Sequence, residues 1–170
     1  ARTGKPLILS TGMASLEEIQ EAVQTAKAAG ATEIALLKCT SAYPSPFKEM
    51  NLLTLSHLAQ TFSCPVGLSD HTLGITVPIA ATALGACIIE KHFILSRSQG
   101  GPDSTFSLEP EEFKRMSTAV QEAWEATGDI RYGVTKEQEK SLLFRRSLFA
   151  IKPIKSGERF TESNTRALRP

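Results

Sequence analysis

Two histidines stand at matching places in this sequence, each at the end of a short apolar stretch. The stretch PVGLSDH ends on His71, and the stretch ACIIEKH ends on His92. If these stretches are neighbouring strands of a parallel sheet, their carboxyl ends meet at the edge where ligands bind in such folds. Neutral imidazole is a common metal ligand, and a pair leaves coordination positions for water and substrate. The pair therefore predicts a metal site that polarises a carbonyl group; the alternative is two hydrogen-bonded core residues.

Carboxylates flank both histidines. Asp70 comes directly before the first histidine, and Glu90 lies two residues before the second. Each can fix an imidazole tautomer, act as a general acid or base, or form a salt bridge inside the fold. Lys91 is expected to point away from Glu90, because side chains alternate along a strand. Asp103 lies in the glycine-hinged loop GGPDSTFS and is a weaker candidate, because a loop aspartate is usually only solvated.

Hydroxyl groups end the other apolar stretches. Ser10, Thr11, Ser41 and Ser69 all fall where a strand is expected to stop. Several hydroxyl donors at the ends of strands suit a phosphate or a carboxylate, although a serine at such a place is also a common helix cap or turn former. Tyr43 follows Ser41 closely and is expected to stack on a substrate or to hydrogen-bond with it.

The elements that must position these residues repeat along the chain. A strand of about five residues is followed by a polar loop and then, in the first units, by an amphipathic helix, a rhythm that predicts a parallel sheet with helices outside it. Strands are expected at 7–11, 34–37, 65–69 and 86–93, and helices at 15–30, 50–62, 75–85 and from 110. Four such units are half of a (β/α)₈ barrel. An open doubly wound sheet is the alternative, weakened by the lack of a glycine-rich dinucleotide motif.

Composition limits the classes of function. The chain has 170 residues, of which 41% are hydrophobic and 22% charged, and its net charge of +1 gives no sign of a nucleic-acid or membrane surface. No apolar run approaches the roughly 20 residues that a membrane helix needs. The three cysteines, Cys39, Cys64 and Cys87, are expected to be reduced, buried thiols of a cytoplasmic protein.

The character of the sequence changes near residue 129. Residues 1–128 carry the strand and helix rhythm, whereas the segment at 129–146 is polar and is interpreted as a linker. Alternating residues and a Ser156-Gly157 turn follow, without a helix long enough to cover a sheet. We therefore expect a small second domain to begin at 147 and to be cut short at 170.

Six motifs together resemble the sialic acid synthase family. They are STGM (10–13), LLKCTSAYPSP (36–46), GLSDHTLG (67–74), IEKHF (89–93), GGPDSTFS (100–107) and RRSLFA (145–150). The match runs in order through essentially the whole chain, and SAYP and GGPDSTFS are most similar to the pseudaminic acid branch. The resemblance implies an α/β fold: the C-terminal half of a (β/α)₈ TIM barrel, followed by the start of a small SAF (antifreeze-like) domain.

The resemblance also implies an activity. Members of the family condense phosphoenolpyruvate with an amino sugar, here a 6-deoxy or N-acetylated amino hexose, to give a nonulosonic acid and phosphate. Pseudaminic acid is the expected product, and N-acetylneuraminate or legionaminate are alternatives. The residues alone also leave open another metal-dependent barrel aldolase or hydrolase, and a non-catalytic glycan-binding module. The amino-terminal half of the barrel would be missing, so this stretch is not expected to be active alone.

Site residues carry over from the family motif by motif. His71 and His92 resemble the two ligands of a divalent metal, usually Mn²⁺, with Mg²⁺ or Co²⁺ as alternatives, and Glu90 resembles a catalytic neighbour. The remaining positions resemble those that bind phosphoenolpyruvate (Ser10, Ser41 and Ser69) and sugar (Tyr43, Asp103 and, inserted from the partner subunit, Arg169). The resemblance thus implies a domain-swapped homodimer in the cytoplasm, with no nucleic-acid or membrane partner.

Overall fold

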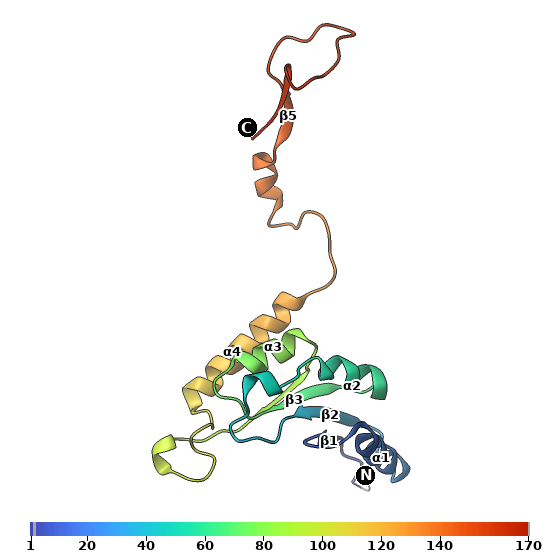
Figure 1. The fold of residues 1–170 in the computed structure, drawn as a ribbon, viewed down its shortest axis with the longest axis vertical. Helices are drawn as coiled ribbons and strands as arrows, with labels where there is room; N and C mark the ends of the chain where they lie inside the picture. The colour runs from blue at the N-terminus through green and yellow to red at the C-terminus, as the bar shows by residue number, and fades with distance from the viewer. Residues whose placement is uncertain (2, 170) are drawn as a thin grey trace. The chain divides into compact units, whose positions relative to one another are not determined.

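The structure, a computed structural model, describes residues 1 and 3–169 (Figure 1). The chain divides into two compact units, residues 1–128 and residues 129–170. Each unit is described by itself below. Pro170, at the end of the expected second domain, lies outside the described residues.

A four-stranded parallel sheet forms the centre of the first unit. Its strands lie side by side in chain order, so each is hydrogen-bonded to the next one along the sequence. The strands are β1 (Leu7–Ser10), β2 (Ile34–Cys39), β3 (Val66–Asp70) and β4 (Ile88–Lys91). The expected succession of strands is confirmed, and this order brings the carboxyl ends of all four strands to the same edge.

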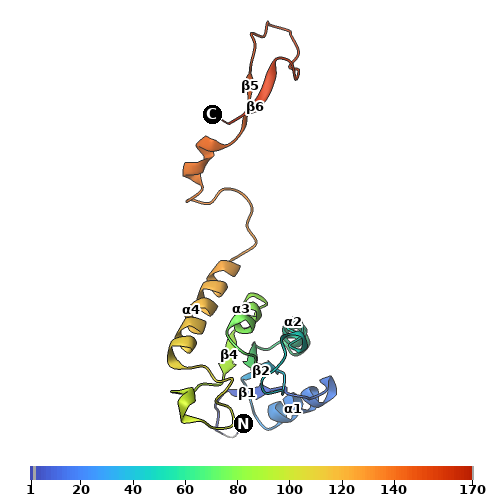
Figure 2. The same ribbon diagram turned by 60° about the vertical axis from the view of Figure 1, so that its left-hand side comes forward.

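Helices cover the outer side of the sheet, where they follow one another in an arc (Figure 2). These helices are α1 (Leu16–Ala28), α2 (Thr54–Phe62), α3 (Thr76–Ala83) and α4 (Pro110–Thr127). Short 3₁₀ turns span Phe47–Glu49 and Arg97–Gln99 in this unit and Glu139–Phe144 in the second unit. Two expected elements are shorter in the structure: β4 spans Ile88–Lys91 and not 86–93, and α2 starts at Thr54 and not at Met50. Asn51 has a φ of 44°, and a residue in this left-handed region cannot be part of a right-handed helix.

The hydrophobic core lies between the sheet and the helices. Leu36 and Leu68 point into it from the middle strands, and Leu55 and Leu58 of α2 pack against them. Met50 belongs to the same core although it lies outside any helix. The described helices include none that is both long and apolar enough to cross a membrane.

The opposite face of the sheet holds the residues that alternate with this core. Leu37, Gly67 and Ile88 are neighbours across three strands of this face. Leu37 is fully buried, and its side chain covers Gly67: a Cβ placed on Gly67 would lie 2.6 Å from Leu37 Cδ2 and 2.5 Å from the Ile88 carbonyl oxygen. The glycine is therefore required here for space.

The cysteines differ from expectation. Cys39 is buried in β2, Cys64 is half-buried, and Cys87 is exposed. The expectation of a buried thiol is wrong for Cys87 because this residue precedes β4, at the sheet edge opposite the polar ends. Its thiol donates to the Val66 carbonyl oxygen at 3.1 Å.

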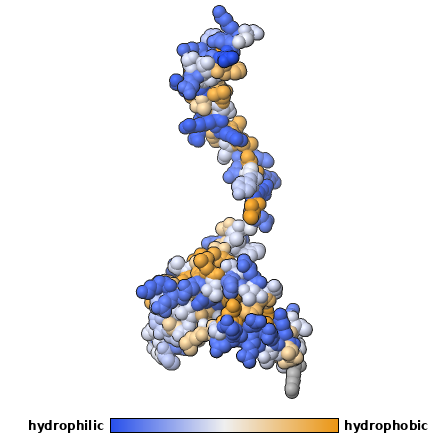
Figure 3. All heavy atoms as spheres, turned by 45° about the vertical axis from the view of Figure 1, so that its right-hand side comes forward, coloured by the Kyte–Doolittle hydropathy of each residue, from blue (hydrophilic) through white to orange (hydrophobic). Residues whose placement is uncertain are grey.

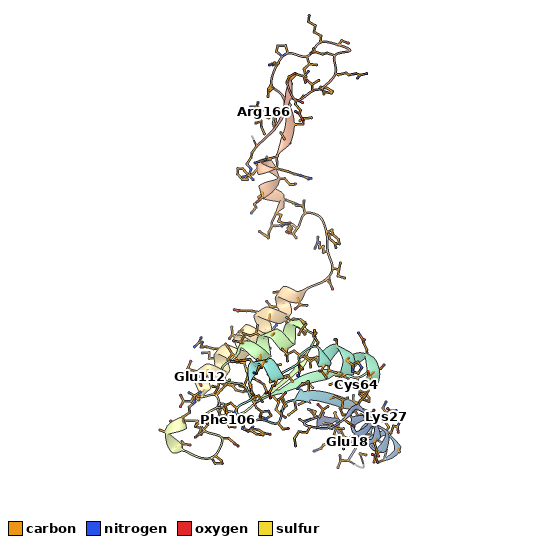
Figure 4. All side chains as sticks on the ribbon, viewed as in Figure 1. Glu18, Lys27, Cys64, Phe106, Glu112 and Arg166 are labelled. Carbon is orange, nitrogen blue, oxygen red and sulfur yellow. The ribbon has the colours of Figure 1, made fainter. Side chains whose placement is uncertain are left out.

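An ion pair connects the first turn of α4 to the loop that follows β4. The Arg97 guanidinium donates to Glu112, whose Oε2 also accepts from the Glu109 backbone N–H at 2.9 Å. Figure 4 shows Glu112 at the start of this helix. The hydrogen bond from Arg97, and secondarily that from the Glu109 backbone, lower the pKa of the Glu112 carboxyl below its ordinary value of 4.5.

We predict that Glu112→Gln lowers the melting temperature at pH 7 by roughly 1–3 °C, because partly exposed ion pairs contribute little. A carboxyl whose pKa is lowered by folding stabilises the fold at pH values above its unfolded-state pKa of 4.5. This contribution is lost as the pH falls through the pKa of the folded state. In thermal unfolding, the difference between variant and wild type should therefore shrink as the pH is lowered from 7 to below 4.5. Glu111→Gln, on the same turn, is the control and should change nothing. A difference that stays the same, or grows, as the pH is lowered below 4.5 would contradict the assignment.

The second unit contains one antiparallel strand pair, β5 (Ser147–Ala150) with β6 (Thr165–Leu168). Large apolar side chains are exposed on it, among them Ile130 at 95% and Phe160 at 75%, and hydrophobic residues are visible at its surface in Figure 3. Among its described residues only Asn164 is buried, held in a turn by hydrogen bonds to Arg159 and Thr161. The described part of this unit therefore buries no apolar core of its own.

Candidate active site at the carboxyl ends of the strands

The two histidines leave the sheet side by side. The last ladder pairs between β3 and β4 are Ser69 with Glu90 and Asp70 with Lys91, so each histidine follows its strand by one residue. The ring centroids of His71 and His92 are 5.1 Å apart, and the ring planes meet at 63°. The predicted convergence of the two imidazoles is thus present in the structure.

The tautomer of His71 is set by its surroundings. Its Nδ1 lies 3.2 Å from the Thr40 carbonyl oxygen, and since a carbonyl can only accept, Nδ1 carries the proton and Nε2 keeps its lone pair. His71 is only 6% exposed. Burial, reinforced by repulsion from His92, lowers the pKa of His71 below its ordinary value of 6.5. The ring is therefore neutral at pH 7, as a metal ligand must be.

His92 is more open to solvent. Its Nδ1 lies 3.7 Å from Asp103 Oδ2, beyond hydrogen-bond distance but close enough for attraction between a carboxylate and the ring N–H. The loop that follows β4 thus brings Asp103 to the site, as the sequence predicts. This contact leaves Nε2 of His92 available to a ligand.

The histidine pair fits a divalent metal ion. With metal–nitrogen bonds of about 2.1 Å, two imidazoles on one ion have centroids roughly 5 Å apart, which matches the observed 5.1 Å. The backbone hydrogen bond to His71 Nδ1 is the outer support that such ligands usually have. Within residues 1 and 3–169, no group of three or more His, Cys, Asp or Glu side chains could hold a metal. The pair alone is thus the candidate donor set here.

Two aromatic rings border the histidines. The Tyr43 ring centroid lies 4.5 Å from that of His71, and Phe106 lies 4.9 Å from His92 and 5.8 Å from Tyr43. Tyr43 was predicted from the sequence, but Phe106 was not. The sequence signal for Phe106 is that it is an apolar residue inside the polar stretch PDSTFS. In the structure Phe106 is only 3% exposed. Figure 4 shows Phe106 on the segment between β4 and α4.

The hydroxyls are distributed unevenly around this site. Ser69 Oγ donates to Glu90 Oε1 at 2.6 Å, so the carboxylate is held on the same side of the sheet as the histidines. Ser41 Oγ lies 3.9 Å from Cys39 Sγ, which in turn lies 4.0 Å from His71 Nδ1. Ser10 stands exposed at the end of β1, two strands away from β3.

Asp70 and Lys91 point to the other side of the sheet. Lys91 Nζ lies 2.6 Å from Asp70 Oδ2, and both side chains are completely buried. Of the roles considered for Asp70, the structure shows the salt bridge, and the expectation that Lys91 points away from Glu90 is confirmed. Arg169 follows β6 in the second unit, whose position relative to this site is not defined.

Comparisons with known proteins place the chain among enzymes named for nonulosonic acid synthesis. Over its whole length it is 47% identical to pseudaminic acid synthase of Helicobacter pylori and 46% identical to N,N'-diacetyllegionaminic acid synthase of Campylobacter jejuni. It covers 50% and 52% of those proteins, and thus spans about half the length of the curated relatives it matches.

Solved structures give the same result. An N-acetylneuraminic acid (sialic acid) synthetase from Leptospira borgpetersenii, with citrate, superposes with a TM-score of 0.75 at 33% identity, over 83% of this chain and 49% of that one. Spore coat polysaccharide biosynthesis protein SpsE from Bacillus subtilis superposes with a TM-score of 0.70 at 34% identity, over 99% and 51%. The NeuB family model matches residues 1–132, which is more than half of the chain. The predicted kinship is confirmed, and the chain belongs to the NeuB family.

Proposed function

We propose that the full-length protein condenses phosphoenolpyruvate with a 6-deoxy or N-acetylated amino hexose to give a nonulosonic acid and phosphate. The observation that carries this proposal is the pair of imidazoles 5.1 Å apart at the ends of adjacent parallel strands, in a chain of the NeuB family. We put pseudaminic acid first as the product because of the relative at 47% identity. Legionaminic acid is the second candidate, favoured by the relative at 46%.

His71 and His92 would hold the divalent ion, Mn²⁺ in first place and Mg²⁺ or Co²⁺ as alternatives. When bound, such an ion acts as a Lewis acid toward a carbonyl oxygen. His71 presents Nε2 because the Thr40 carbonyl holds its Nδ1 proton. His92 presents Nε2 while Asp103 faces its Nδ1.

The balanced reaction needs both an anion site and a proton acceptor. Carbon 3 of phosphoenolpyruvate bonds to the aldehyde carbon of the sugar, and the aldehyde oxygen becomes a hydroxyl by taking up a proton. Water gives up a proton as it adds to carbon 2, so the protons balance, and phosphate leaves as its C–O bond breaks. We assign Glu90 the role of accepting the proton from water, because Ser69 holds its carboxylate beside the histidines. Ser69 and Ser41 are assigned to phosphoenolpyruvate. Ser10, at the end of β1 and two strands away from β3, is assigned to phosphoenolpyruvate from the family resemblance alone.

Tyr43 and Asp103 are assigned to the sugar, because both border the histidine pair from loops. Phe106 adds an apolar wall beside them. The rest of the proposal derives from the family resemblance: a partial TIM barrel, an SAF domain starting near residue 147, and a domain-swapped homodimer in which Arg169 reaches the partner's site. The proposed compartment is the cytoplasm, in keeping with three free cysteines.

Phosphate release by the full-length protein tests this function. The protein is incubated with phosphoenolpyruvate, Mn²⁺ and candidate amino hexoses, and phosphate is assayed. We expect release only with a sugar present, loss of release on chelation, and recovery when Mn²⁺ is returned. Glu90→Gln, which removes the proton acceptor, should lower the rate about 100-fold or more, whereas Glu111→Gln should not. Absence of phosphate release with every sugar would contradict the proposal.

A further inference from the structure

The site described above uses one side of the strand ends, and a buried ion pair occupies the other. Asp70 and Lys91 are direct partners in the last ladder pair between β3 and β4. The Nζ–Oδ2 distance is 2.6 Å and neither side chain is exposed. Because each residue directly precedes a histidine, this pair links the two strands at the point where both histidines leave the sheet.

Thr72 completes the network from the residue after His71. Its backbone N–H donates to Asp70 Oδ1 at 3.0 Å, and its hydroxyl donates to Asp70 Oδ2 at 3.1 Å. Lys91 Nζ donates to the Thr72 carbonyl oxygen. Thr72 is itself fully buried. Asp70 and Thr72, the two neighbours of His71 in the chain, are therefore hydrogen-bonded to each other. Both are also bonded to Lys91, the residue before His92.

Every side-chain nitrogen and oxygen of this network has a hydrogen-bond partner. No buried side-chain nitrogen or oxygen in the described residues lacks a hydrogen-bond partner. A buried polar network whose members are bonded to one another rigidifies its surroundings. A buried ion pair contributes little net stability compared with apolar residues of similar size, and its better-attested use is to specify one geometry. Because this network lies at the two strand ends, next to His71 and His92, the geometry it would specify is that of these two residues.

We infer that Asp70, Lys91 and Thr72 form a positioning clamp that fixes the separation and orientation of the His71 and His92 rings. The inference rests on the proposed function, because it assigns the clamp to the metal site of that function. The clamp touches no substrate; it acts through the backbone of the two strand ends. Ser69 and Glu90 join the same strands on the side that faces the site, so the strand ends are linked on both faces.

The double variant Asp70→Leu/Lys91→Met tests the clamp in the full-length protein. It removes both charges and fills the space with apolar side chains of similar size. We expect it to remain folded, with a cooperative melt. We expect its Mn²⁺ affinity, measured by calorimetry, to fall about 10- to 100-fold, and its absorption spectrum with Co²⁺ to change because the ligand geometry changes. Thr82→Val is the matched control: it removes a buried hydroxyl bond within α3, remote from the strand ends, and should alter neither measurement.

A second readout needs no metal. In nitrogen NMR of the metal-free protein, His71 should show a slowly exchanging Nδ1 proton because of its bond to the Thr40 carbonyl oxygen. We expect this signal to broaden or disappear in the double variant and to persist in Thr82→Val. If the double variant does not fold, Thr72→Val takes its place and should weaken Mn²⁺ binding, with Thr72→Ser restoring it.

The outcomes separate this inference from the proposed function. If wild type binds no Mn²⁺, the proposed site fails, and the clamp is judged by the His71 proton signal alone. If wild type binds Mn²⁺ and the folded variants bind it equally, with unchanged Co²⁺ spectra and an unchanged His71 proton, the clamp is overturned and the site is not.

Discussion

Replacing His71 by alanine in the full-length protein should lower Mn²⁺ affinity and the rate of phosphate release by more than about 100-fold, because residues that merely support a metal ligand already contribute 10- to 100-fold. His71 is the less exposed of the two histidines, and its proton is bound by the Thr40 carbonyl oxygen. Removal of the ring leaves His92 as the single imidazole at the strand ends. Calorimetric titration with Mn²⁺ and the phosphate assay measure the two effects.

The chain supplies its own control for this change. His57 is exposed on α2, so His57→Ala removes the same side chain at a place remote from the strand ends. In both measurements it should match wild type. Circular dichroism establishes that both variants are folded. Equal Mn²⁺ affinity in the His71 and His57 variants would refute the two-histidine site.

Gly67→Val should cost about 3 kcal/mol or more of unfolding free energy, because even one added carbon at this position does not fit. The Cβ would lie 2.5 Å from the Ile88 carbonyl oxygen and 2.6 Å from Leu37 Cδ2. The carbonyl belongs to the neighbouring strand and cannot move without disturbing the sheet. Chemical denaturation of the full-length protein should therefore show a lowered midpoint.

Two further variants identify the cause. A Cβ placed on Gly85 would meet no atom within 4 Å, but Gly85 has a φ of 97°, so we attribute the expected cost of Gly85→Val, about 1–2 kcal/mol, to backbone strain. In the pair Leu37→Ala/Gly67→Val, part of the collision is relieved, and the double variant should cost less than the two single changes added together. An equal cost for Gly67→Val and Gly85→Val would show that crowding at Gly67 was wrongly inferred.

The sequence predicts the strand ends well because local rules govern them. Continuous apolar stretches identified β2 and β3, and Ser15 with Glu18 marked the start of α1, where the structure has the reciprocal capping bonds at 2.7 Å and 3.3 Å. Side-chain alternation then separated Lys91 from Glu90. The meeting of the two histidines followed from the parallel order of the sheet and needed no knowledge of side-chain packing.

Other features depended on contacts between segments distant in sequence. Phe106 reaches His92 only through the fold of the loop after β4, and no period in the sequence identifies such a residue. The late start of α2 depends on the conformation of Asn51, which an apolar pattern does not reveal. The exposure of Cys87 reflects its place before the strand, not its residue type. The sequence leaves several roles open to Asp70. The structure shows that it forms a buried salt bridge with Lys91.

The register between β3 and β4 has a consequence for how this family can change over time. Lengthening the segment between the two strands, for example within α3, leaves the ladder and the histidine pair as they are. One residue inserted in β3 before Ser69 would instead rotate the remainder of the strand by half a turn. Ser69 and His71 would then point into the hydrophobic core, and Asp70 would face the side of the sheet that now holds the histidines. Related sequences should therefore vary freely in the length of this helix and hardly at all in the length of this strand.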